Sequence, residues 1–260
     1  MKKLVILIFM LSCQLSMGMK SWNKIPYPYK KMGISYITVN QLERGKLKSA
    51  SITMNPLNLD FFNPKSLEVK ANLNLIKLDY FLLPFLNIYG IGGRIDTEAS
   101  FNLGKGTLSF NPSGKPILDN TPFKKIKQKS EGNLYGAGAL IAGEYKNIFT
   151  SLQYTYTEIK LKGDIATKSA EIGSARVGYN YKYSNSINIM PYLSISYQKT
   201  DTSIKGKIPN TNLNYKFNME LEKETPSIGI FFKLPKNFTY LIDYSWGNKE
   251  LLAMEIGYRF

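Results

Sequence analysis

Histidine is absent from the 260 residues, and cysteine occurs once, at Cys13. The lack of histidine excludes Ser-His-Asp and Cys-His catalysis, His-ligated metals and imidazole acid–base chemistry. Beyond the N-terminus there is no apolar run of about 18 residues, which excludes a helical membrane protein. These absences argue against a His-dependent enzyme and leave β-structure as the open route to a membrane.

The composition is that of a basic, tyrosine-rich folded protein. Lys and Arg number 34 against 19 Asp and Glu, which gives a formal net charge of +15. The hydrophobic fraction of 43% is too high for a disordered basic tail, and 18 Tyr and 14 Phe favour strands. By length the chain is one large domain or two small ones.

Residues 1–18 have the pattern of a secretory signal. Lys2 and Lys3 precede the short apolar segment Leu4–Leu11, and small residues end the segment at Gly18. Lipidation at Cys13 is the alternative interpretation. Cleavage after Gly18 leaves residues 19–260 without cysteine, so neither a disulfide framework nor a thiolate metal site is expected. An exported, cysteine-free chain indicates the bacterial periplasm or outer membrane.

The C-terminus carries the strongest pattern. Apolar and small or charged residues alternate strictly from Leu252 to the terminal Phe260. A strand with one face in lipid and the other in a polar lumen requires this alternation. The segment resembles the closing strand of bacterial outer-membrane β-barrels, and this resemblance implies that Tyr258 and Phe260 form an assembly signal read by the barrel-assembly machinery. An amphipathic strand of a soluble sandwich is the alternative.

Similar alternation recurs upstream, and the connections between the strands alternate in length. Short connections fall near 83–86, 145–147, 184–186 and 235–237, and long outer loops are expected near 43–66, 102–132 and 201–224. Short turns are typical of the periplasmic side and long loops of the outer side. The sequence therefore predicts an all-β, antiparallel transmembrane β-barrel of ten strands, within a range of eight to twelve, in the bacterial outer membrane.

Several short segments resemble an uncharacterised group of bacterial outer-membrane barrel proteins. They are scattered over most of the mature chain: Lys77–Tyr80, Leu83–Asn87, Tyr89–Gly90, Arg176–Tyr179 and Gly257–Phe260. The resemblance implies a location and a fold and brings no known activity with it.

Alternation also predicts which charges face the lumen. Both signs are present in this set, which favours a mutually neutralising network that fills a narrow barrel over a selectivity ring in a small pore. The predicted lumen residues are Lys77, Asp79, Arg176, Asp243, Glu255 and Arg259, together with Lys182 and Lys233.

The loop at 102–132 is rich in lysine. Lys124, Lys125, Lys127 and Lys129 are candidates for contact with anionic lipopolysaccharide phosphates or an acidic host surface. A solvated loop is the plainer interpretation, because Lys outnumbers Arg throughout the chain. The charge is diffuse and lacks a recognised motif, so nucleic-acid binding is not expected.

Three functions remain open on the sequence. The first is a non-enzymatic outer-membrane barrel with a surface-interaction or envelope-structural role. The second is a narrow channel for small solutes, with a preference for anions, and the third is a His-independent enzyme. We assign no catalytic residues and expect no cofactor and no metal; outer-membrane lipid, lipopolysaccharide and the barrel-assembly machinery are the expected partners.

Overall fold

The structure is a computed structural model that describes residues 30–54, 57–62, 66–102, 105–110, 116–122, 126–162, 168–200, 203–207, 214–220, 224–247 and 249–260. The predicted signal at 1–18, with Cys13, lies outside the described residues. Within the described part of the chain, no helix is long and apolar enough to cross a membrane.

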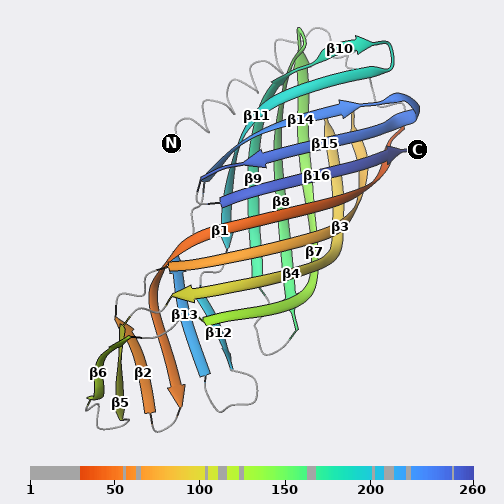
Figure 1. Ribbon diagram of the computed structural model, residues 1–260. Helices are drawn as coiled ribbons and strands as arrows, with labels where there is room; N and C mark the ends of the chain where they lie inside the picture. Colours follow the sequence, from red (N-terminus) through yellow and green to blue (C-terminus); the bar gives the residue numbers. More distant parts are fainter. Residues whose placement is uncertain are drawn as a thin grey trace.

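Ten antiparallel strands form one closed barrel (Figure 1). Their hydrogen-bonded order is β16-β15-β14-β11-β9-β8-β7-β4-β3-β1, and pairing of β16 with β1 closes the ring. The predicted fold class and strand number are confirmed. Closure satisfies every edge, which a sheet in lipid requires. The barrel strands are β1 (Met32–Met54), β3 (Ser66–Leu83), β4 (Leu86–Asn102), β7 (Ile126–Tyr145), β8 (Ile148–Leu161), β9 (Lys168–Tyr179), β11 (Ile187–Thr200), β14 (Glu224–Lys233), β15 (Phe238–Ser245) and β16 (Lys249–Arg259).

Tight turns join the strands at the end of the barrel where β1 begins and β16 ends. Lys146 and Asn147, between β7 and β8, have φ of 47° and 69°. The short 3-10 turn η2 (Pro235–Asn237) likewise places Lys236 and Asn237 at positive φ. Two successive residues at positive φ match the right-handed twist of the flanking strands. β10 (Tyr181–Ser184) leads into the turn before β11.

The opposite end of the barrel continues into a second antiparallel sheet. Beyond Lys46, β1 pairs with β13 (Asn214–Glu220) on one side and with β2 (Leu57–Phe62) on the other. β12 (Ser203–Lys207) flanks β13, while β5 (Lys105–Phe110) and β6 (Pro116–Pro122) follow β2. Figure 1 shows these strands projecting away from the tight-turn end.

Strand occupies much of the outer segments at 43–66, 102–132 and 201–224, in which the sequence also allowed strand-like extensions at 48–56 and 211–222. The strands also run past their predicted limits, since β1 continues to Met54 rather than ending near residue 42. The physical reason is that the alternation used to find strands marks only the part in lipid. Above the membrane the outer face becomes polar and apolar residues move to the inner face, so the outward apolar pattern stops while the hydrogen-bonded ladder continues.

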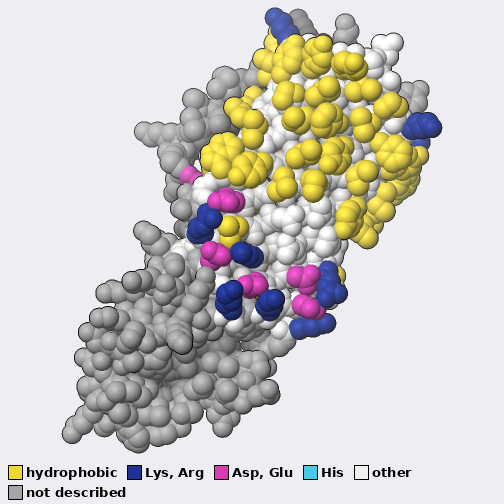
Figure 2. All heavy atoms as spheres, viewed as in Figure 1, with side chains coloured by type: hydrophobic (Ala, Val, Ile, Leu, Met, Phe, Trp, Pro, Cys, Tyr) yellow, Lys and Arg dark blue, Asp and Glu magenta, His cyan; other side chains and the backbone are white. Residues whose placement is uncertain are grey.

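Exposed apolar side chains cover the tight-turn half of the barrel on the face that Figure 2 shows, and exposed large hydrophobic residues lie on the other strands as well. We call this surface the apolar belt. From Leu252 to Phe260 the strand rises about 26 Å, or about 20 Å of belt height at a tilt of about 40°, which is close to the apolar band of known barrels. Exposed large hydrophobic side chains on this belt include Ile34, Tyr36, Ile76, Leu78, Ile88, Ile141, Tyr154, Val177, Leu193, Ile228, Tyr244, Leu252 and Ile256.

A charged collar bounds the belt on the side away from the tight turns. It consists of outward-facing charges on neighbouring strands, and Figure 2 shows part of it as a mixed band below the apolar field. Cross-strand ion pairs in the collar join Arg44 to Glu250 at 2.7 Å, Arg94 to Glu131 at 2.6 Å and Lys199 to Glu171 at 3.6 Å.

Candidate functional site

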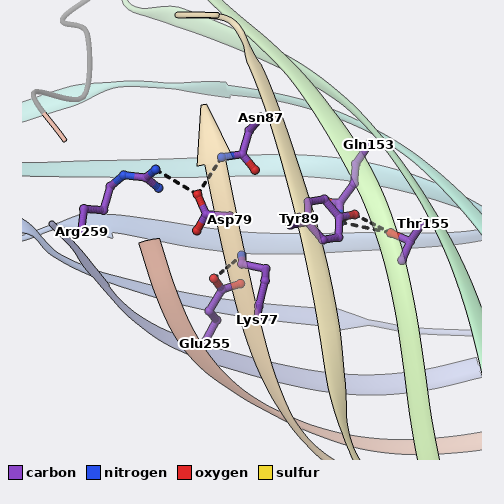
Figure 3. A network of polar contacts seen from close by, with 8 residues as sticks. All are labelled: Lys77, Asp79, Asn87, Tyr89, Gln153, Thr155, Glu255 and Arg259. Carbon is purple, nitrogen blue, oxygen red and sulfur yellow. Dashed lines mark hydrogen bonds and ion pairs between the residues drawn. The ribbon is translucent and has the colours of Figure 1, made fainter. Parts of the chain in front are cut away.

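The lumen is the candidate site, and its first layer lies at the tight-turn end (Figure 3). Arg259 on β16 forms an ion pair with Asp79 on β3 at 2.9 Å, and Asn87 donates a hydrogen bond to the same carboxylate at 2.7 Å. The strand between them, β1, has Gly33 at this level, and a Cβ there would collide with the Asp79 carboxylate. Gly33 thus leaves room for two side chains to meet across β1.

Arg259 also holds the start of β1. Its guanidinium donates to the carbonyl oxygens of Lys30 at 3.2 Å and Lys31 at 3.1 Å, and it lies 4.5 Å from the ring centroid of Phe81. Asp79 is 8% exposed, so the paired carboxylate is withdrawn from solvent. One guanidinium therefore ties β16, β1 and β3 together at the seam where the barrel closes.

A second ion pair lies one step further into the lumen. Lys77 on β3 donates to Glu255 on β16, and the two side chains are 21% and 19% exposed. The Lys77 ammonium also lies 5.9 Å from the ring centroid of Tyr89 (Figure 3). The pair repeats the seam-crossing arrangement of Asp79 and Arg259.

Tyr89 spans β7 to reach β8. Its hydroxyl lies 2.6 Å from Thr155 Oγ1 and accepts a hydrogen bond from Gln153 Nε2 at 2.7 Å (Figure 3). Gly138 on β7 lies beneath the ring, and a Cβ at that position would strike the phenol. An inward glycine again lets a long side chain cross a strand.

The opposite wall contains the same arrangement. Tyr192 on β11 crosses β14 over Gly229 and donates to Asp243 Oδ2 on β15 at 2.6 Å. Ser227 donates to the same carboxylate oxygen at 3.3 Å. The Arg176 guanidinium lies 5.6 Å from the centroid of the Tyr192 ring, which is 4% exposed. Aromatic and charged groups thus line the inner face of both walls.

Beyond these polar layers the lumen turns apolar. Leu75, Ile95 and Leu134 are 6%, 5% and 3% exposed, although their strands carry polar residues on the outer face at this height. Inside and outside have exchanged polarity relative to the membrane belt. Apolar packing can stabilise the barrel here because its outer face is in water rather than in lipid.

A buried polar cluster lies at the collar end of the lumen. Lys249 donates to Gln198 Oε1, and Gln41 donates to Glu43 Oε2 at 3.0 Å. Glu43 and Lys249 face each other in the β1–β16 ladder and are 6% and 7% exposed. Burial raises the pKa of Glu43, opposed by the charge of Lys249 and by the Gln41 hydrogen bond, and burial lowers the pKa of Lys249.

Most of the charges predicted for the lumen lie on its inner face. Lys77, Asp79, Arg176, Asp243, Glu255 and Arg259 all lie on the inner face, and four of them form the two seam-crossing ion pairs. Lys182 and Lys233 instead lie at the tight-turn rim, where the strands end, and both are exposed. The sequence did not identify the partners Asn87, Tyr89, Gln153, Thr155 and Tyr192. Each occupies an inward-facing position in the alternation of its strand, which was the available signal.

The lysine loop and the terminal aromatics lie elsewhere. Lys124 and Lys125 fall outside the described residues, whereas Lys127 and Lys129 lie 3.8 Å and 3.7 Å from Glu98. Tyr258 and Phe260 face outward, with ring centroids 6.4 Å apart. In the described part of the chain, no group of three or more acidic or thiol side chains is arranged to hold a metal ion.

Comparison with known proteins adds likenesses of shape only. No protein-family model and no curated protein matches the sequence. Among solved structures, the translocator domain of the autotransporter NalP from Neisseria meningitidis has a TM-score of 0.44 at 9% identity, covering 100% of this chain and 98% of that one. The β domain of the Bordetella autotransporter BrkA has 0.41 at 9% identity, covering 88% and 98%.

A transporter also appears among the matches. The Pseudomonas putida toluene transporter TodX has a TM-score of 0.32 at 8% identity, covering 88% of each chain. Likenesses this distant assign no role. By its own closed sheet, apolar outer belt and side-chain-lined interior, the chain is a ten-stranded β-barrel of the outer-membrane type.

Proposed function

We propose that the protein is a non-enzymatic outer-membrane barrel whose lumen is closed by its own side chains and whose outer sheet serves contact at the cell surface. The observation that carries the proposal is a set of side-chain bridges on the inner wall, each of which spans one strand: Asp79 to Arg259, Lys77 to Glu255, and Tyr192 to Asp243. Narrow barrels are filled by side chains, and open aqueous channels belong to wider ones.

The outer sheet supports the second half of the proposal. The outer part of β1 carries strands on both sides, in the order β12-β13-β1-β2-β5-β6, beyond the belt that lies in lipid. A barrel that served only to span the membrane needs no such extension. The absence of histidine from the sequence is consistent with a contact role rather than catalysis.

Conductance across a planar lipid bilayer tests the closed lumen. We expect no discrete open steps from the purified full-length chain after insertion. The variant Lys77→Ala/Glu255→Ala/Tyr192→Ala should open a measurable pore while it keeps heat-modifiable gel mobility. Open steps from the unaltered chain would replace the proposal with that of a narrow channel.

Labelling of intact cells tests the outer sheet. An epitope inserted at 111–115, between β5 and β6, should bind antibody without permeabilisation. An epitope inserted between Lys146 and Asn147, in a tight turn, is the control and should bind only after permeabilisation. The reverse pattern would contradict the assigned orientation.

A further inference from the structure

The charged collar is uneven, and its β4–β7–β8 wall differs from the rest. On this wall three carboxylates meet four cations, and two of the carboxylates are each shared by two cations; the third, Asp96, lies 3.4 Å from Arg94. Glu131 pairs with Arg94 at 2.6 Å and with Lys162 at 3.8 Å, while Glu98 pairs with Lys127 at 3.8 Å and Lys129 at 3.7 Å. We call the four cations the cation cluster.

The three lysines of the cation cluster are presented outward. Lys127, Lys129 and Lys162 have side chains that are 66%, 82% and 80% exposed, whereas the Glu98 side chain is 29% exposed. Their distances to the carboxylates, 3.7–3.8 Å, exceed hydrogen-bond length. Each ammonium therefore keeps its hydrogen-bond donors available for an external anion.

Small residues occupy the lipid-facing belt below the cluster, where Arg94 takes the next outward position of β4 after Gly92 and Glu98 lies two outward positions further. Gly90 and Gly92 on β4 pair with Ala137 and Tyr135 on β7, and Ala139 lies two residues further along. A Cβ at Gly90 would meet only the Gly136 carbonyl oxygen at 3.9 Å, so the outward space above this glycine is open. We call Gly90, Gly92, Ala137 and Ala139 the small-residue platform. It adjoins the exposed rings of Tyr135, Tyr154 and Tyr156.

Other walls of the collar lack this combination. Arg44 and Glu250 form a one-to-one pair at 2.7 Å above large apolar residues, and Lys199 and Glu171 form another at 3.6 Å. In neither of those pairs is the carboxylate shared by a second cation. Only the β4–β7–β8 wall, among the described residues, joins shared carboxylates to a row of small residues in the belt below.

We propose that the β4–β7–β8 wall binds a phosphorylated lipid of the outer leaflet. Its phosphate lies on Lys127, Lys129 and Lys162, and an acyl chain lies along the small-residue platform. The cluster begins at Arg94, the first outward position of β4 above the apolar belt, and extends away from the belt to Lys127 and Lys129, on the side where headgroup phosphates lie beside a barrel. The inference rests on the orientation given under Proposed function, but it does not depend on whether the lumen is closed.

The charge half of the proposal is tested with the purified full-length chain and micellar lipid A, both bisphosphorylated and enzymatically dephosphorylated. Bisphosphorylated lipid A should raise the temperature at which the folded gel band disappears. Lys129→Gln/Lys162→Gln should weaken its apparent affinity about 25-fold, because each lysine beside an anionic lipid contributes about fivefold. The control Lys199→Gln should change it less than about fivefold.

The acyl half is tested by filling the platform. Gly90→Leu should weaken lipid A binding without loss of folding, whereas Gly173→Leu, at an outward site on β9 with nothing within 4 Å of a Cβ, should bind as the unaltered chain does. Inorganic phosphate at equal concentration should give no stabilisation. Equal binding by the two charge variants, or equal stabilisation by dephosphorylated lipid A or free phosphate, overturns the proposal. A conductance result leaves it unaffected, so failure of the closed-lumen proposal remains distinguishable.

Discussion

Tyr192 on β11 lies over Gly229 of β14, and its phenolic hydroxyl donates a hydrogen bond of 2.6 Å to Asp243 on β15. The two residues are not on neighbouring strands, because β14 lies between β11 and β15. The glycine is the condition for the bridge. Gly33 and Gly138 stand in the same relation to Asp79 and to Tyr89, so the lumen is built from side chains that cross strands lacking a side chain at that level.

Gly229→Ala should therefore destabilise the barrel, because the new methyl group would collide with the Tyr192 ring and with the Ile242 carbonyl oxygen at 2.7 Å. Overpacking of this kind costs about 1–3 kcal/mol. The measurement is the urea midpoint of unfolding in detergent. Gly173→Ala is the matched control, because the space around its Cβ is empty. Equal midpoints for the two variants would show that Tyr192 moves aside freely.

The ion pair between Asp79 and Arg259 should be costly to break from one side. Asp79→Ala leaves the Arg259 side chain, which is 19% exposed, without its carboxylate partner. Removal of one partner of a buried ion pair lowers the free energy of unfolding by about 3–5 kcal/mol. The double variant Asp79→Ala/Arg259→Leu should be more stable than Asp79→Ala alone. Unfolding free energies of the four members of the cycle measure this coupling. Strict additivity would mean that the two side chains do not interact.

The sequence predicted these charges but not their partners. Period-two alternation states which face a residue occupies, and on that basis Asp79 and Arg259 both belong inside. It does not state which strands lie two apart in the closed ring, because that depends on the pairing of β16 with β1. The contact of Tyr89 with Thr155 could not be predicted for a related reason. The alternation places Tyr89 on the inner face but does not show that Gly138 on the next strand leaves room for its ring to reach β8.

Strand length was underestimated for a different physical cause. The outward positions of β3 change from Ile76 to Asn74 and Asn72 where the strand leaves lipid, while the inward positions become apolar at Leu75 and Leu73. The alternation thus reverses phase at the membrane boundary. The apolar pattern of the outward face therefore ends there, whereas the ladder with β4 continues to Ser66.

Stability should depend on pH through Glu43. Burial raises the pKa of this carboxyl in the folded barrel above its ordinary value of 4.5, so the folded state binds the proton more tightly than the unfolded state does. This contribution is fully present below pH 4.5 and is lost as the pH rises through the folded-state pKa. Burial lowers the pKa of Lys249 across the ladder, so the Glu43→Gln variant is needed to isolate the contribution of the carboxyl.

The measurement is unfolding free energy at a series of pH values from 4.5 to 7.5, compared between the unaltered chain and two variants. Glu43→Gln should remove part of the loss of stability that accompanies rising pH, since glutamine does not ionise. Glu250→Gln, at the exposed pair with Arg44, is the control and should keep the slope. Identical slopes for the unaltered chain and Glu43→Gln would contradict the assignment.

The closing strand offers the sharpest test of the lipid-facing assignment. Met254 faces outward on β16 at mid-belt, whereas Ala253 faces inward and pairs in the ladder with Asp243. Met254→Arg places a charge in hydrocarbon, which costs about 2–4 kcal/mol near the midplane. Ala253→Arg places the same charge beside the Asp243 carboxylate, so the two substitutions differ in environment but not in chemistry. Folded protein in the outer-membrane fraction, scored by heat-modifiable mobility, should fall for Met254→Arg and be largely retained for Ala253→Arg.

Deletion of Phe260, which lies beyond the last ladder pair of β16, should reduce assembly through loss of the terminal signal while the purified chain still folds in detergent. Equal levels for the two arginine variants would show that lipid does not cover Met254, and normal assembly without Phe260 would remove the terminal aromatic from the signal.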